Sequence, residues 1–108
     1  MNNTLIAALV AVSLTACSQS IPETTYINGN QAIVQMRATP NAEWELLMDG
    51  QIVARKSVNL LTYDDVLHGN YKGQPVTARM YLRSNGWVSH KVADIFVNGQ
   101  LVETLVLS

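Results

Sequence analysis

The chain has 108 residues, 48% of them apolar, with seven basic and eight acidic side chains. This length allows one small domain, and the even charge balance excludes the basic excess typical of nucleic-acid-binding proteins. The single cysteine excludes an internal disulfide and a cysteine metal site, and we expect no cofactor.

An apolar segment lies close to the N-terminus. Leu5 to Leu14 are ten residues, nine of them apolar. A membrane-spanning helix needs roughly 20 residues, whereas this segment has the length of the hydrophobic region of a signal peptide. A buried strand or helix is the alternative interpretation.

The four residues that end this segment, Leu14-Thr15-Ala16-Cys17, resemble the lipobox of bacterial lipoproteins. Met1 to Thr4 depart from the signal-peptide pattern, because they contain no lysine or arginine. The resemblance implies that residues 1–16 are removed and that Cys17 is acylated, so the protein is held in the cell envelope. Ser18 favours the outer membrane, at its periplasmic face, because aspartate at this position favours retention in the inner membrane. We expect a polar tether over residues 17–25 and a folded domain over residues 26–108.

Turn signals dominate the rest of the chain. Four Asn-Gly or Asp-Gly pairs lie between apolar runs, and such pairs are typical of two-residue β-hairpin turns. They are Asn28-Gly29, Asp49-Gly50, Asn85-Gly86 and Asn98-Gly99. Apolar and polar residues alternate between them, for example over residues 31–38 and 75–84, which indicates strands with one buried face.

Each turn predicts a strand register, because residues at equal distances from a two-residue turn face each other. The expected pairs include Leu47 with Ile52, Trp44 with Arg55, Tyr81 with His90, Val92 with Leu105, Asp94 with Glu103, and Phe96 with Leu101. Residues 59–73 break the alternation, and we interpret them as one helical turn from Thr62 to Gly69 or as a long connection. The fold class is therefore all-β, a small antiparallel β-sandwich or twisted sheet of six to seven strands.

One predicted sheet face combines cationic and aromatic side chains. The row Thr77, Arg79, Tyr81 and Arg83, with His90, is an outward stripe that suits an anionic or carboxylate-rich protein partner, or is an ordinary solvated face. We expect Val88, Val92, Phe96, Leu101 and Leu105 on the same face, covered by residues 59–73 or free to bind a partner. The possible partner-binding residues are Arg79, Tyr81, Arg83, His90, Phe96 and Leu101. A second expected docking site is the uncovered edge of the last strand, residues 100–107.

No residues form a convincing catalytic arrangement, so we expect a non-enzymatic, protein-binding lipoprotein of the cell envelope. An alternative is a phage or mobile-element exclusion lipoprotein that blocks a receptor or an entry machine. A metal-dependent or hydrolytic enzyme would use Asp64, Asp65, His68 and His90, because a helical turn would bring the first three together.

Overall fold

The computed structural model describes residues 19–57 and 64–107. The predicted signal segment, Cys17 and Thr62 lie outside these residues. The all-β prediction is confirmed, with eight strands instead of six or seven. They are β1 (Glu23–Ile27), β2 (Asn30–Ala38), β3 (Glu43–Met48), β4 (Gln51–Ser57), β5 (Asp65–Tyr71), β6 (Gln74–Asn85), β7 (Val88–Val97) and β8 (Gln100–Leu107).

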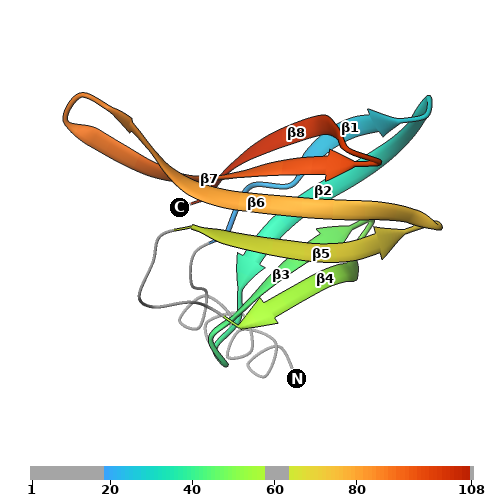
Figure 1. The fold of residues 1–108 in the computed structure, drawn as a ribbon, viewed down its shortest axis with the longest axis horizontal. Coiled ribbons are helices and arrows are strands. Elements are labelled where there is room, and N and C mark those ends of the chain that lie inside the picture. The colour runs from blue at the N-terminus through green and yellow to red at the C-terminus, as the bar shows by residue number, and fades with distance from the viewer. Residues whose placement is uncertain (1–18, 58–63, 108) are drawn as a thin grey trace, which may run out of the picture.

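The strands form two antiparallel four-stranded sheets, each in the order of the chain. Strands β1 to β4 make sheet A and strands β5 to β8 make sheet B, and the sheets face each other (Figure 1). Their inner faces share one core, whose fully buried members include Met36, Leu46, Met80 and Ile95. No helix long and apolar enough to cross a membrane occurs within residues 19–57 and 64–107.

Tight turns explain why neighbouring strands pair. At Asn28-Gly29, Asp49-Gly50, Lys72-Gly73 and Asn98-Gly99 both turn residues have positive φ angles. This is the conformation of a type I′ turn, whose twist matches that of the flanking strands. Three of the four predicted turns therefore form where we expected them, and Lys72-Gly73 is an additional one.

The predicted registers hold only next to the turns. Leu47 faces Ile52 and Phe96 faces Leu101, as predicted. A register shift lies immediately beyond each of these two pairs, and the more distant predicted pairs are therefore wrong by one residue. Trp44 faces Lys56 instead of Arg55, Val92 faces Val106, and Asp94 faces Thr104 instead of Glu103. The shift removes the unfavourable pair of two acidic side chains and places Leu105 in the core.

The turn between β6 and β7 lies one residue later in the chain than expected. Its central residues are Gly86 and Trp87, because Asn85 faces Val88, and Gly86 has a φ of 68°. The predicted turn at Asn85-Gly86 is therefore wrong. Arg83 is the residue that faces His90, and Tyr81 faces Val92.

Residues 65–71 also correct the prediction. They form neither a helical turn nor an irregular connection but the edge strand β5, paired with β6 over its whole length. Gly69 allows β5 to pass close to β4, since a Cβ atom there would overlap the carbonyl oxygen of Val53. Strands β4 and β5 therefore pack against each other along one side of the sandwich, although they belong to different sheets.

The opposite side is closed by β1 and the residues before it. The hydroxyl of Thr25 donates a hydrogen bond to the carbonyl of Val102 in β8, at 2.7 Å. Ser20 is buried, bridges Leu107 at the end of β8, and pairs with Met36 of β2 through its own N–H. The folded chain thus begins before the boundary expected at Thr25, and its own residues occupy part of the β8 edge that we expected to be uncovered.

Candidate partner-binding face

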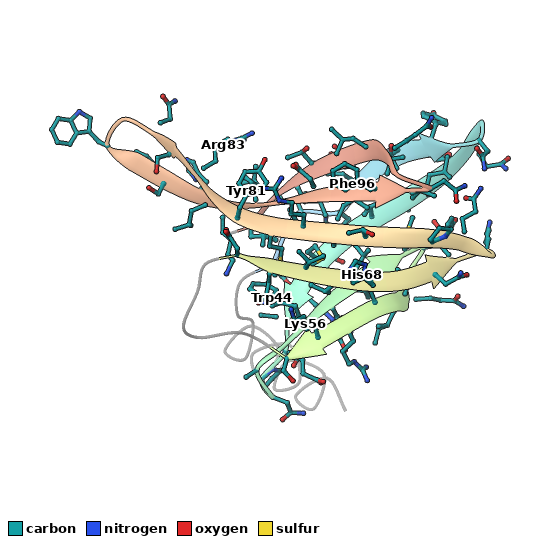
Figure 2. The ribbon with its side chains drawn as sticks, viewed as in Figure 1. Trp44, Lys56, His68, Tyr81, Arg83 and Phe96 are labelled. Carbon is teal, nitrogen blue, oxygen red and sulfur yellow. The ribbon has the colours of Figure 1, made fainter. Side chains whose placement is uncertain are left out.

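All six residues predicted to bind a partner lie on the outer face of sheet B. They alternate along β6, β7 and β8 with side chains that enter the core, such as Ala78, Met80 and Ile95. The structure divides them into two groups. Arg79, Tyr81, Phe96 and Leu101 lie over the body of the sandwich, whereas Arg83 and His90 face each other on a hairpin that extends beyond it (Figures 1 and 2).

The polar part of this face is a connected network. Arg79 lies opposite Asp94, and its guanidinium carbon is 5.2 Å from the centre of the Tyr81 ring. Thr104 donates its hydroxyl proton to Asp94 at 2.8 Å. A hydrogen bond to Asp94 raises the pKa of the Tyr81 phenol, and partial burial adds to the effect. Arg79, Tyr81, Asp94 and Thr104 therefore form one polar group on this face.

The apolar part of the face lies next to this network. Phe96 is half-buried and faces Leu101, which is 57% exposed. Val106, which is 49% exposed, faces Val92 on the other side of the Asp94–Thr104 pair. Residues 59–73 were one expected cover of this face, but the part of that segment that the structure describes, residues 64–73, lies in the plane of sheet B as β5 and its turn. Within the described chain, exposed apolar side chains therefore lie on both sides of the polar network.

The hairpin beyond the body, residues 82–91, is here called the arm. Only β6 and β7 form it, because β5 pairs no further than Met80 and β8 no further than Lys91. Its turn residue Trp87 is fully exposed, and Leu82 and Val88 are also exposed. Sequence reasoning missed Trp87, since a turn at Asn85-Gly86 would have placed it within the following strand.

The base of the arm is packed against sheet A. The Lys91 ammonium lies 4.9 Å from the centre of the Trp44 ring, and Trp44 is buried in the core. A cation above an indole face is favourable, and this contact crosses from one sheet to the other. This contact therefore ties the base of the arm to sheet A.

The residues considered for metal binding do not converge. Asp65 points into the sandwich, where it meets Lys56 at 2.9 Å, whereas His68 is exposed and contacts Thr77 across the strand. Alternation along a strand places these two side chains on opposite faces. Among residues 19–57 and 64–107, no three His, Cys, Asp or Glu side chains gather in a way that would hold a metal ion.

A separate charged group lies on the outer face of sheet A. Glu45 is almost fully buried between Arg37, at 2.8 Å, and Arg55, at 2.9 Å. Burial opposes ionisation of Glu45, but the hydrogen bonds and charges of the two arginines outweigh it and hold the pKa of the carboxyl below its ordinary value. This group links three strands and is satisfied within the fold, so it offers little to a partner.

A small hollow of about 180 Å³ lies between the first turns of the two sheets. It is lined by Ile27, Asn28, Asn30, Tyr71, Lys72 and Gln74. The lining contains neither a carboxylate nor a histidine, and the Lys72 ammonium lies over the Tyr71 ring at 5.2 Å. These residues do not provide the paired acid and base that most hydrolytic reactions use.

The chain matches no known family model, no curated protein and no solved structure. Function is therefore inferred from the geometry above and from the sequence that precedes the described domain.

Proposed function

We propose that this chain is a lipid-anchored protein of the bacterial cell envelope that binds another envelope protein through the outer face of sheet B. The single observation that carries the binding role is the apolar pair of Phe96 and Leu101 beside the network of Arg79, Tyr81 and Asp94. Exposed apolar side chains beside an arginine and a tyrosine are typical of protein interfaces.

The lipid anchor is supported by sequence. The apolar segment Leu5–Leu14 ends in the lipobox-like residues 14–17, and only two residues separate Cys17 from Ser20, which is fixed to the sandwich. An acylated Cys17 would thus hold the domain directly against the periplasmic face of a membrane, with Ser18 favouring the outer membrane. More than one acyl chain makes such anchoring stable.

The partner that fits this face carries a carboxylate next to an apolar side chain. Arg79 can accept a planar acidic group, because arginine binds carboxylates through two parallel hydrogen bonds. Leu101 and Phe96 supply the adjoining apolar area. No residue of this face is arranged to transfer a proton or attack a bond, so the proposed role is binding without catalysis.

Site-specific photocrosslinking in membranes tests the binding face. A photoreactive residue at Leu101 should give one defined adduct, and the same residue at Ile52, on the outer face of sheet A with 42% exposure, serves as the matched control. The Leu101 adduct should persist in Arg79→Lys and weaken in Arg79→Glu. Equal adducts from both positions, or an adduct that Arg79→Glu leaves unchanged, would contradict the proposal.

Mass spectrometry of the membrane fraction tests the anchor separately. The mature chain should begin at Cys17 and carry the mass of its acyl chains. A native product that retains Met1 and a free thiol would overturn the envelope assignment and leave the binding face to be judged alone.

A further inference from the structure

The arm presents an indole at the point of the molecule farthest along the β6–β7 hairpin. Trp87 is fully exposed and occupies the second position of the turn. Its side chain buries no area in the fold, so packing within the chain does not account for it. Leu82 and Val88 extend the exposed apolar surface down the hairpin.

The arm also has a charge of its own. Residues 82–91 contain Arg83, His90 and Lys91 and no acidic residue. The remainder of the chain carries five basic and all eight acidic side chains. An anionic surface would therefore attract the arm and repel the body. This difference would orient the domain with its arm toward the surface.

The anchor leaves the body at the base of the arm. Lys91 faces Leu107 in the β7–β8 ladder, and Leu107 is bridged to Ser20 on its other side. Two strand spacings, about 10 Å, thus separate Lys91 from Ser20. Cys17 precedes Ser20 by three residues, so the covalent chain keeps it within about 10 Å of that point. Figure 1 shows the arm extending past this end of the sandwich, beyond the end of β8.

We propose that the arm is a second membrane contact, in which Trp87 enters the interfacial region of the same bilayer that holds the acylated Cys17. Tryptophan is enriched at this depth because its ring is apolar and its N–H seeks a polar partner. Arg83 and His90 would meet anionic headgroups such as phosphatidylglycerol, which attract basic side chains near the surface. The inference rests on the proposed lipid anchor, and it implies that sheet B is held at a fixed angle to the membrane.

A membrane explains the arm better than a protein partner does. A protein interface would extend over the flanks of the ribbon, whereas Ser84 and Ser89 pair with each other there at 2.8 Å. Trp87 and Val88 lie at the turn, Arg83 and His90 lie behind them, and Leu82 lies at the base of the arm. The order of the first two groups matches the order of polarity from the acyl boundary to the headgroups.

Tryptophan fluorescence of the acylated full chain in vesicles provides the test. The chain has two tryptophans, Trp44 in the core and Trp87 at the arm tip, and Trp87→Phe isolates the signal of Trp44. In phosphatidylcholine vesicles that contain phosphatidylglycerol, the exposed component should shift to shorter wavelength. It should also be quenched by brominated acyl chains and lose its accessibility to acrylamide. Arg83→Gln should reduce these changes, and Trp87→Phe should abolish them without altering circular dichroism.

Two results would overturn the inference. One is a Trp87 emission that remains fully accessible to acrylamide on anionic vesicles while the protein is bound through its acyl chains. The other is protection of Trp87 that requires a native envelope protein and is insensitive to brominated lipid, which would assign the arm to a protein partner. If mass spectrometry instead shows an unmodified Cys17, the proposed lipid anchor fails, and the same vesicles still show whether Trp87 contacts lipid.

Discussion

The hydroxyl of Tyr71 donates a hydrogen bond to Oδ2 of Asp49 at 2.6 Å and thereby connects the two sheets. Tyr71 ends β5, and Asp49 begins the turn between β3 and β4. The second carboxylate oxygen of Asp49 accepts the backbone N–H of Ile33 at 3.0 Å. One carboxylate thus fixes a turn, a neighbouring strand and the opposite sheet.

We expect Tyr71→Phe to lower the free energy of unfolding by about 1–2 kcal/mol at neutral pH, because it removes a hydrogen bond to a charged group. The hydrogen bond from Tyr71, with that from Ile33, holds the pKa of Asp49 below its ordinary value of 3.8. The folded state therefore releases this proton more readily than the unfolded state. The stabilisation is complete above the ordinary pKa and is lost as the pH falls below it.

Chemical denaturation of Tyr71→Phe at neutral pH and at about pH 3 measures this contribution, which should shrink in acid. Tyr26→Phe is the matched control, since Tyr26 is 67% exposed and lies in sheet A. An equal loss of stability from both variants, or a Tyr71→Phe effect that does not change with pH, would show that the hydrogen bond is not the cause.

The buried Glu45 should also stabilise the fold, through its two arginines. We expect Glu45→Gln to cost about 1–2 kcal/mol, less than for a fully buried ion pair, because about half of each guanidinium side chain is exposed. Since folding lowers the pKa of Glu45, the stabilisation is present above 4.5 and is lost as the pH falls. Urea unfolding across the acid range checks both points.

The control for this prediction is Glu43→Gln on the same strand. Glu43 lies 3.9 Å from Arg55 and is partly exposed, so its loss should change stability by less than about 0.5 kcal/mol. A Glu43→Gln variant that is as destabilised as Glu45→Gln would refute the special role of the buried carboxylate.

The close approach of β4 and β5 gives a steric prediction. A Cβ atom at position 69 would overlap the backbone carbonyl of Val53, and backbone cannot move aside as a flexible side chain can. We expect Gly69→Ala to cost about 2–3 kcal/mol. Gly99→Ala, where a Cβ has open space and only the positive φ of 77° opposes it, should cost about 1 kcal/mol. Thermal and urea unfolding of the two variants decide the order, and similar costs would refute the proposed contact.

The arm should be the least protected part of sheet B. Beyond the Leu82–Lys91 pair its strands pair only with each other, whereas Val76 and Met80 of β6 lie between β5 and β7. We expect the arm amides to exchange with solvent much faster than those of Val76 to Met80, because opening the arm exposes little apolar area. Hydrogen exchange followed by NMR measures this difference. Uniform protection along β6 would show that the arm is covered in solution.

Much of this architecture follows from local chemistry. Asn-Gly and Asp-Gly pairs favour positive φ angles, so three turns and the pairs next to them were predictable. Lys72-Gly73 adopts the same turn without the usual residue at its first position, and β5 was therefore missed. At Asn85-Gly86 an Asn-Gly pair is present, but the turn is displaced by one residue, because Gly86 is the first residue of that turn and not the second.

The remaining differences arise from contacts between distant residues. The register shift at Leu46 places Glu45 opposite Arg55, and the shift at Ile95 separates Asp94 from Glu103. The outer face of sheet B was predictable from period-two alternation. Which part of it lies over the body and which part on the arm depends on where β5 and β8 end, and this is a property of the whole fold.

Ser20 attaches the segment before β1 to the sandwich, and its substitution should loosen this attachment. Its hydroxyl accepts the N–H of Met36 at 2.9 Å, and its own N–H donates to the Met36 carbonyl at 2.8 Å. Ser20→Ala would leave a buried N–H without its acceptor, which costs about 1–2 kcal/mol. The Met36 amide should then exchange faster with solvent. Ser84→Ala on the exposed arm should leave both stability and that amide unchanged. A Met36 amide that stays fully protected in Ser20→Ala would show that the segment is held by something other than this hydroxyl.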